Sequence, residues 1–177
     1  WYRAVRETTG NLRLSRRRLS IALGNHLYQA RYRTGEISGV PVYFIDVPEL
    51  YDRPELYGEQ GQDYPDNAER FGLLSLAALE LVRQIKFVPD VVHAHDWQAG
   101  LVPAYLHQQR EHASFFAKTS SLFTIHNLGY QGVFPLQTGR DLGLDETLMR
   151  SDGLEYHGQI SLLKSGIRFA DQVNTVS

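Results

Sequence analysis

Residues 90–100, Asp90-Val-Val-His-Ala-His-Asp-Trp-Gln-Ala-Gly100, predict a short strand that runs directly into a helix. The strand is expected over residues 90–95. Asp96 is of a residue type that caps helix N-termini, and the helix is expected over residues 97–110. A strand followed at once by a helix is the repeating unit of α/β folds, so this segment indicates the class of the protein.

The same alternation continues towards the C-terminus. Ser120-Ser-Leu-Phe-Thr-Ile125 predicts a second strand, and residues 172–176 predict a third. Between them, residues 139–153 are polar and rich in turns, and residues 158–170 have the apolar spacing of a helix, with Ile160, Leu163, Ile167 and Ala170 on one face. Alternating strands and helices imply parallel pairing with right-handed crossovers. We therefore expect an α/β fold with a doubly wound parallel sheet.

Residues 66–89 predict the longest helix. Asp66 and Glu69 have the spacing of a capping box, and Pro89 ends the segment. Apolar residues recur between these points at helical spacing, namely Phe71, Leu74, Ala78, Leu81, Val82 and Ile85.

The first third of the chain predicts strands and one long loop. Leu19–Leu23 and residues 26–32 predict short strands, and residues 35–39 a turn. Residues 40–47 are apolar on both faces, as in a buried sheet strand. Residues 48–66 contain three prolines, two glycines and three tyrosines (Tyr51, Tyr57 and Tyr64), which predicts a long, ordered loop outside the core, of the kind that often carries function.

Composition excludes several classes of protein. The 177 residues carry a net charge of −2, and the only dense basic run is Arg16-Arg17-Arg18, so a nucleic-acid binder is not expected. The absence of cysteine excludes disulfides and thiolate chemistry. No apolar run is long enough to span a membrane, and there is no recognisable targeting segment. The chain begins at Trp1 and its single methionine is Met149, from which we expect a fragment of a longer protein.

Polar residues follow two of the predicted strands. Asp96 ends the first, and His126-Asn127 end the second, thirty positions later. Ligands of open α/β sheets bind outside the carboxyl ends of the strands, so these residues are expected at one rim. Asp96 suits hydrogen bonding to sugar hydroxyls or helix capping, and His126 suits donation to a hydroxyl or stabilisation of developing charge. Asn127 equally suits a turn.

Two other readings of this region remain open. His93 and His95 share a strand face, and with Asp96 they suggest a metal site of a hydrolase, to which His126 or His157 would add a ligand. Trp97, Tyr57, Tyr130 and Tyr156 suit stacking against sugars. For each taken singly, a core aromatic residue is the stronger interpretation, and the tyrosine-rich loop at 51–64 favours stacking more than the rest.

Long segments of this chain occur in the same order in bacterial glycogen synthases and plant starch synthases, and from about residue 40 onward the chain resembles that family. The segments are Tyr51-Asp-Arg-Pro54, Asp63-Tyr-Pro-Asp-Asn-Ala-Glu-Arg-Phe71, residues 90–100, Thr124-Ile-His-Asn-Leu-Gly-Tyr-Gln-Gly-Val-Phe134, residues 153–166 and residues 170–177.

The resemblance implies a retaining glucosyltransferase of the GT-B type, with two facing Rossmann-like domains whose parallel sheets carry helices on both faces. Such enzymes move glucose from ADP-glucose to the nonreducing 4-hydroxyl of an α-1,4-glucan, without a catalytic metal or a cofactor. They work in the bacterial cytoplasm or the plastid stroma, with neither nucleic acid nor membrane as partner. The N-terminal domain mainly binds the glucan, and the C-terminal domain holds most of the nucleotide-sugar pocket.

Carried over by position, Asp96 and His126 match catalytic residues of the family. Tyr57 and Asn127 match substrate-binding positions, and Trp97 is a further candidate. The chain lacks the Lys-x-Gly-Gly-Leu loop and the C-terminal domain of the family. We therefore expect residues 1–177 to be part of an N-terminal, acceptor-side domain that is inactive alone. The alternative is a noncatalytic glucan-binding module.

Overall fold

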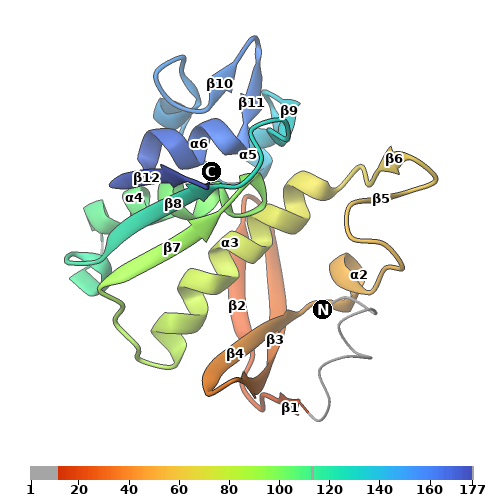
Figure 1. Cartoon of the computed structure of the whole chain (residues 1–177), viewed down its shortest axis with the longest axis vertical. Helices are drawn as coiled ribbons and strands as arrows, with labels where there is room; N and C mark the ends of the chain where they lie inside the picture. Colours follow the sequence, from red (N-terminus) through yellow and green to blue (C-terminus); the bar gives the residue numbers. More distant parts are fainter. Residues whose placement is uncertain (1–11, 113, 177) are drawn as a thin grey trace.

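The predicted parallel sheet consists of three strands, β7 (Val91–His95), β8 (Ser120–Ile125) and β12 (Gln172–Thr175), in the order β12-β8-β7 (Figure 1). The computed structural model describes residues 12–112 and 114–176, so Trp1 and Ser177 lie outside the described residues. Both pairings are parallel, with His95 opposite Thr124 and Thr124 opposite Asn174. The predicted parallel pairing is therefore confirmed.

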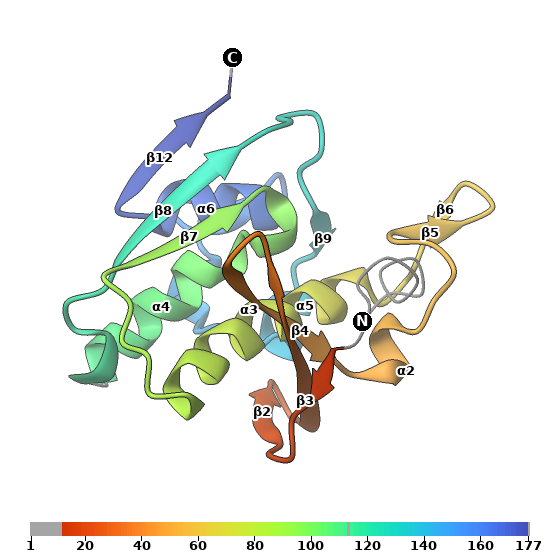
Figure 2. The same ribbon diagram turned by 60° about the horizontal axis from the view of Figure 1, so that its bottom comes forward.

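Two helices, α4 (Leu101–His112) and α6 (Leu162–Phe169), pack on each other and lie along one face of this sheet (Figure 2). The close approach of α6 depends on Gly166, where an added Cβ would lie 2.3 Å from the ring of Phe123 on β8. We expected helices on both faces of the sheet. In the described ranges α4 and α6 lie on the same face of this sheet (Figure 2). His93 and His95 of β7 are exposed.

The N-terminal part forms a separate antiparallel sheet from β1 (Arg13–Leu14), β2 (Leu19–Leu23), β3 (His26–Ile37) and β4 (Val40–Asp46). Strand β3 is longer than predicted and pairs with β1, β2 and β4. Ser38 and Gly39, both with positive φ, form the two-residue turn into β4, which is the geometry that suits a tight hairpin. The prediction that residues 40–47 are buried on both faces was wrong, because the hairpin leaves Val40 60% exposed.

Helix α3 (Asn67–Gln84) contacts both β2 and α4 and so joins the two sheets. Its buried side is wider than the predicted stripe, since Leu73 and Ala77 are fully buried and Ala78 is exposed. The predicted capping box does not form. Asp66 instead pairs with Arg53, and Glu69 accepts a hydrogen bond from the hydroxyl of Tyr28.

The remaining elements are short. The segment predicted as a loop contains α2 (Pro48–Tyr51), β5 (Gly58–Glu59) and β6 (Gln62–Asp63). Two 3-10 turns, η1 (Trp97–Ala99) and η2 (Ser114–Phe116), flank α4. The segment after β8 holds β9 (Val133–Pro135), α5 (Thr138–Asp141), η3 (Glu146–Met149), β10 (Glu155–Tyr156) and β11 (Gln159–Ser161).

The last helix begins later than predicted, because residues 159–161 pair with β9 and β10 as strand β11. Ser161 is the N-cap, and its hydroxyl accepts a hydrogen bond from the backbone N–H of Lys164. Across the described ranges, each helix is too short or too polar to cross a lipid bilayer.

Candidate functional site

Asp96 directly follows β7 and has a strained backbone conformation, with φ 55° and ψ −178°. Residues other than glycine rarely adopt this region, and holding one there costs about 1–3 kcal/mol. The side chain does not cap the following turn, so the predicted capping role was wrong. Its Oδ1 instead accepts hydrogen bonds from the backbone N–H of His126 at 2.7 Å and of Asn127 at 3.3 Å. The carboxylate thus links the ends of β7 and β8 by hydrogen bonds. From the sequence we predicted that Asp96 and His126 lie at the same rim, but not that they are bonded.

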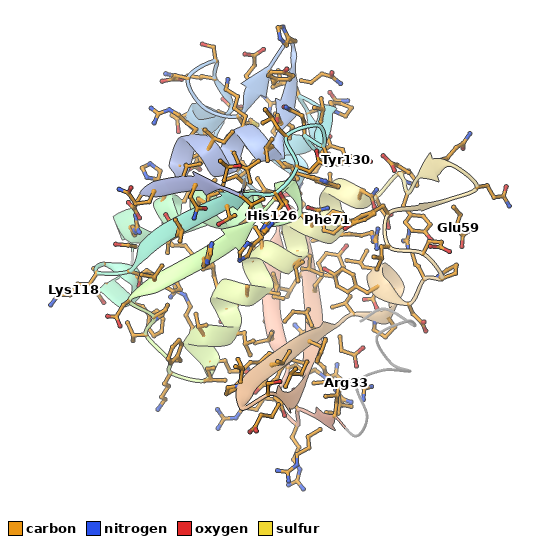
Figure 3. All side chains as sticks on the ribbon, in the orientation of Figure 1. Arg33, Glu59, Phe71, Lys118, His126 and Tyr130 are labelled. Atoms are coloured by element: carbon orange, nitrogen blue, oxygen red, sulfur yellow. The ribbon has the colours of Figure 1, made fainter. Side chains whose placement is uncertain are left out.

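His126 and Asn127 directly follow β8 and are exposed. Figure 3 shows His126 at this end of the sheet. Nε2 of His126 lies 3.1 Å from Nδ1 of His95. The side-chain oxygen of Asn127 accepts a hydrogen bond from the backbone N–H of Gly129 at 2.9 Å, which is the Asx-turn role that its residue type suggested. Asp96, His126 and Asn127 therefore come together at the predicted rim of the sheet.

The two histidines of β7, His93 and His95, have partners that compete with metal binding. The rings of His93 and His95 stack with centroids 4.0 Å apart, and Nε2 of His93 lies 2.6 Å from Oγ1 of Thr124. Partial burial and the neighbouring His93 and His126 lower the pKa of His95, against the opposing effect of Asp96. Among residues 12–112 and 114–176, no group of three acidic, histidine or cysteine side chains is arranged to hold a metal ion. The arrangement that the hydrolase hypothesis requires is thus not formed by these residues.

A cavity of about 650 Å³ opens next to this rim. Its lining comes from three segments: the turn after β7, the stretch from the end of β8 into β9, and the stretch that leads into the first residue of α3. The lining residues are Tyr57, Asp63, Asn67, Trp97, Gln98, Gly129, Tyr130, Gln131, Gly132, Val133 and Phe134. Trp97 directly follows Asp96, and Gly129 lies two positions beyond Asn127. The cavity therefore shares two of its walls with the polar rim.

An aromatic cluster forms the floor of this cavity. The ring of Trp97 meets that of Phe71 edge-on at 4.8 Å and lies 6.2 Å from Phe134 and 6.3 Å from Tyr57. Gly132 has φ +58°, and an added Cβ there would lie 2.3 Å from the Trp97 ring. Trp97 is consequently fixed in place, whereas Tyr57 remains 44% exposed at the edge of the cavity.

Arg70 holds the segment that carries Tyr57, and the sequence analysis missed it. Its side chain is fully buried and donates to the carbonyl oxygens of Leu50 and Leu56, each at 2.9 Å, and to Oδ1 of Asn67 at 2.5 Å. Asn67 in turn donates from Nδ2 to the carbonyl of Tyr57 at 2.8 Å. The sequence does place an arginine next to Phe71, within the apolar stripe of the predicted helix. A charge buried there without partners would be costly, so its position could have indicated a buried hydrogen-bond network.

The tyrosines of this segment differ in their roles. Tyr51, predicted to lie outside the core, is buried, and its hydroxyl donates to the carbonyl of Arg70 at 2.6 Å. Tyr64 lies under two guanidinium groups, with Cζ of Arg53 4.5 Å and Cζ of Arg70 5.0 Å from its ring centre. Only Tyr57 of the three lines the cavity. Tyr156, the remaining aromatic candidate, stacks edge-on against His157 in the β10–β11 hairpin.

A second cavity, of about 500 Å³, lies between the β2–β3 turn, the start of α3 and α5. Asn25, His26, Glu69 and Asp141 are among its lining residues. None of the predicted site residues lines it. The chemistry expected from the sequence is therefore associated with the cavity beside Trp97.

Comparison with known proteins gives a consistent result. The profile of the family described as "Starch synthase catalytic domain" matches residues 1–177. A glycogen synthase of Syntrophotalea carbinolica is 44% identical over 176 residues, and one of Variovorax paradoxus is 48% identical over 147 residues. These alignments cover 99% and 81% of this chain, but only 36% and 29% of the two relatives. The chain thus spans about a third of the length of these relatives.

A solved structure shows the same fold. The catalytic domain of starch synthase IV from Arabidopsis thaliana, bound to ADP and acarbose, superposes with a TM-score of 0.81 at 30% identity. The match covers 94% of this chain and 34% of that one. The resemblance seen in the sequence motifs is therefore confirmed over the length of the chain. By its sequence and by its fold, the chain belongs to the starch synthase catalytic domain family.

Proposed function

We propose that the chain is the acceptor-side part of a retaining glucosyltransferase, which moves glucose from ADP-glucose to the nonreducing 4-hydroxyl of an α-1,4-glucan. The observation that carries this proposal is the tie between Asp96 and the backbone of His126 and Asn127, formed beside an aromatic-floored cavity. The related starch synthase IV domain was solved with ADP and acarbose, which fits a nucleotide and a sugar chain as ligands.

In this proposal Asp96 and His126 are the catalytic residues of this chain, and Tyr57, Trp97 and Asn127 contact substrate. Glucosyl transfer develops positive charge at the reacting carbon, which fixed polar groups in a closed cleft stabilise. The strain at Asp96 and its two hydrogen bonds hold the carboxylate and the β8 end in one arrangement before substrate arrives, so that little reorganisation is needed. The nucleotide sugar would bind mainly to a second domain of the longer protein.

The cavity supplies the part of the proposal that this chain alone can test. Binding pockets combine apolar walls with a few polar groups that fix orientation, and the cavity offers Tyr57, Trp97 and Tyr130 with Asp63 and Gln98. We expect maltooligosaccharides to bind the chain and release heat in calorimetry. Tyr130→Ala should weaken binding about tenfold, since Tyr130 is 67% exposed and its loss leaves the core intact.

The matched control is Tyr43→Ala, because Tyr43 is a half-exposed tyrosine of β4 that does not line the cavity. It should leave the binding heat unchanged. Equal weakening by both variants, or no heat from the unmodified chain at millimolar maltooligosaccharide, contradicts the assignment of the cavity.

Catalysis needs the longer protein. We expect the 177-residue chain to transfer no glucose from radiolabelled ADP-glucose, because most of the nucleotide-sugar pocket lies elsewhere in this proposal. In the longer protein, His126→Ala should lose most turnover while remaining folded, and His107→Ala on the exposed side of α4 should keep it. Retained turnover in His126→Ala contradicts the catalytic role of His126. If the unmodified longer protein transfers no glucose while maltooligosaccharides still bind, the result supports the alternative of a noncatalytic glucan-binding module, which the aromatic floor also suits.

A further inference from the structure

Three histidines lie in a row on the exposed face of the parallel sheet. His95 is the middle one, stacked on His93 at 4.0 Å between ring centroids and 5.3 Å from the ring of His126. Its Nδ1 and the Nε2 of His126 are 3.1 Å apart. In the part of the chain that the structure describes, this is the one hydrogen bond of either imidazole ring, so the two side chains orient each other.

Counting protons shows what this contact permits. A hydrogen bond between two imidazole nitrogens requires one proton between them, so one ring must donate and the other accept. The pair can be neutral or can carry one positive charge and keep this bond. A second added proton would place two N–H groups face to face, and the bond would be lost. The hydrogen bond between His95 and His126 can therefore form when the pair is neutral or carries one positive charge, but not when both rings are charged.

The neighbours of the pair act against extra charge. Oγ1 of Thr124 donates to Oδ1 of Asn174 at 2.5 Å, so it has no proton left to give to Nε2 of His93. His93 must then donate from Nε2, at 2.6 Å, and keeps Nδ1 unprotonated when neutral. A charge on His95 would lie against this stacked ring and against His126, with the Asp96 carboxylate as the nearby group that favours it.

We propose that His95 is a positioning residue for His126, which fixes the orientation of its imidazole and limits the pair to one shared hydrogen-bonded proton. The role given to His126 rests on the function proposed above, but the contact itself does not. The lowered pKa of His95 agrees with this arrangement, because it keeps the middle ring neutral near pH 7. His126 then meets substrate with one nitrogen already engaged and the other, Nδ1, available.

The test uses NMR of the chain labelled with 15N-histidine. Near pH 8 we expect a scalar coupling across the hydrogen bond between Nδ1 of His95 and Nε2 of His126. On acidification the two rings should shift together and take up their protons in two separated steps. His107→Asn, on the exposed side of α4, is the control and should leave both results unchanged.

Two variants separate orientation from charge. His95→Asn places an amide near the position of Nδ1, so the ring of His126 should keep its contacts while the second titration step disappears. His95→Ala should lose both the contacts of the His126 ring and the second titration step. The NMR signals of the His126 ring should then be averaged over several orientations. His126→Ala should raise the pKa of His95 towards its ordinary value.

A wild-type chain with no coupling across the bond, in which the two rings titrate independently, overturns the proposal. A His126 ring whose signals are the same in wild type and His95→Ala also overturns it. None of these readouts needs glucan or ADP-glucose, so failure of this inference is distinguishable from failure of the proposed function.

Discussion

The polar rim of the parallel sheet, formed by Asp96, His126 and Asn127, lies next to a cavity that Tyr57 lines from the segment before α3, and these two regions are fixed in different ways. At the rim, exposed or half-exposed groups are held by hydrogen bonds between strand ends and by a strained backbone at Asp96. In the segment before α3, the exposed Tyr57 depends on the fully buried Arg70 beneath it. Interactions in water contribute little to stability, whereas a buried charge is costly to leave without partners.

This difference predicts how the two regions respond to substitution. Changes beneath Tyr57 should destabilise the fold strongly, because the backbone carbonyl groups of Leu50 and Leu56 depend on the buried Arg70 side chain. Changes at the rim should leave the fold in place and alter the chemistry. The following substitutions test that contrast, beginning with the largest expected effect.

Arg70→Met should destabilise the chain by about 3–5 kcal/mol, as expected when one partner of a buried hydrogen-bonded charge network is removed. The carbonyl oxygens of Leu50 and Leu56 and the side chain of Asn67 would lose their donor. Urea unfolding measures the effect. Arg83→Met, on the partly exposed C-terminal turn of the same helix, is the control and should cost less than about 1 kcal/mol. Equal effects would remove the contrast between the two regions.

Gly132→Ala should cost about 1–3 kcal/mol, because the new methyl group would overlap the ring of Trp97 and the residue has a positive φ. The aromatic floor would have to move, so maltooligosaccharide binding should weaken together with stability. Gly158→Ala has φ +79° but open space around the added carbon, and it isolates the backbone cost. If the two variants are equally destabilised, contact with Trp97 contributes nothing.

Asp96→Gly should be more stable than Asp96→Ala by about 1–2 kcal/mol, although both lose the carboxylate. Glycine tolerates φ 55° and ψ −178°, and alanine retains the strain. In the glucosyltransferase proposed above, both should lose turnover alike. Thermal unfolding of the two variants separates backbone strain from hydrogen bonding. Equal stabilities would show that the Asp96 backbone relaxes at no cost.

The parallel sheet and the meeting of Asp96 with His126 could be predicted because both follow from local order. Each strand ends where a polar residue begins, and parallel pairing brings those ends together. Arg70 could not be predicted in this way, since its partners are carbonyl groups of a segment 14 to 20 positions away. The capping box at Asp66 and Glu69 failed for a similar reason. Arg53 and Tyr28, which are distant in sequence, take both carboxylates.

The smallest expected effect lies at the opposite, amino-terminal end of the same strands. Asp171 accepts hydrogen bonds from Arg110 at 2.7 and 3.1 Å and from the backbone and hydroxyl of Ser121 at 2.6 and 2.9 Å. Chiefly through Arg110, these bonds lower the pKa of Asp171 to about 2.

Because the folded-state pKa of Asp171 lies below the unfolded value, its stabilisation is complete above about pH 4 and is lost as the pH falls towards 2. The side chain is 41% exposed, so the contribution should stay below about 1 kcal/mol. Wild type should exceed Asp171→Asn by this amount at pH 6 in urea unfolding, and the gap should close near pH 2. A constant gap would mean that packing, and not charge, joins β8 to β12 at this end. The amino-terminal ends of the strands would then be held by packing, whereas the rim at their carboxyl ends is held by hydrogen bonds.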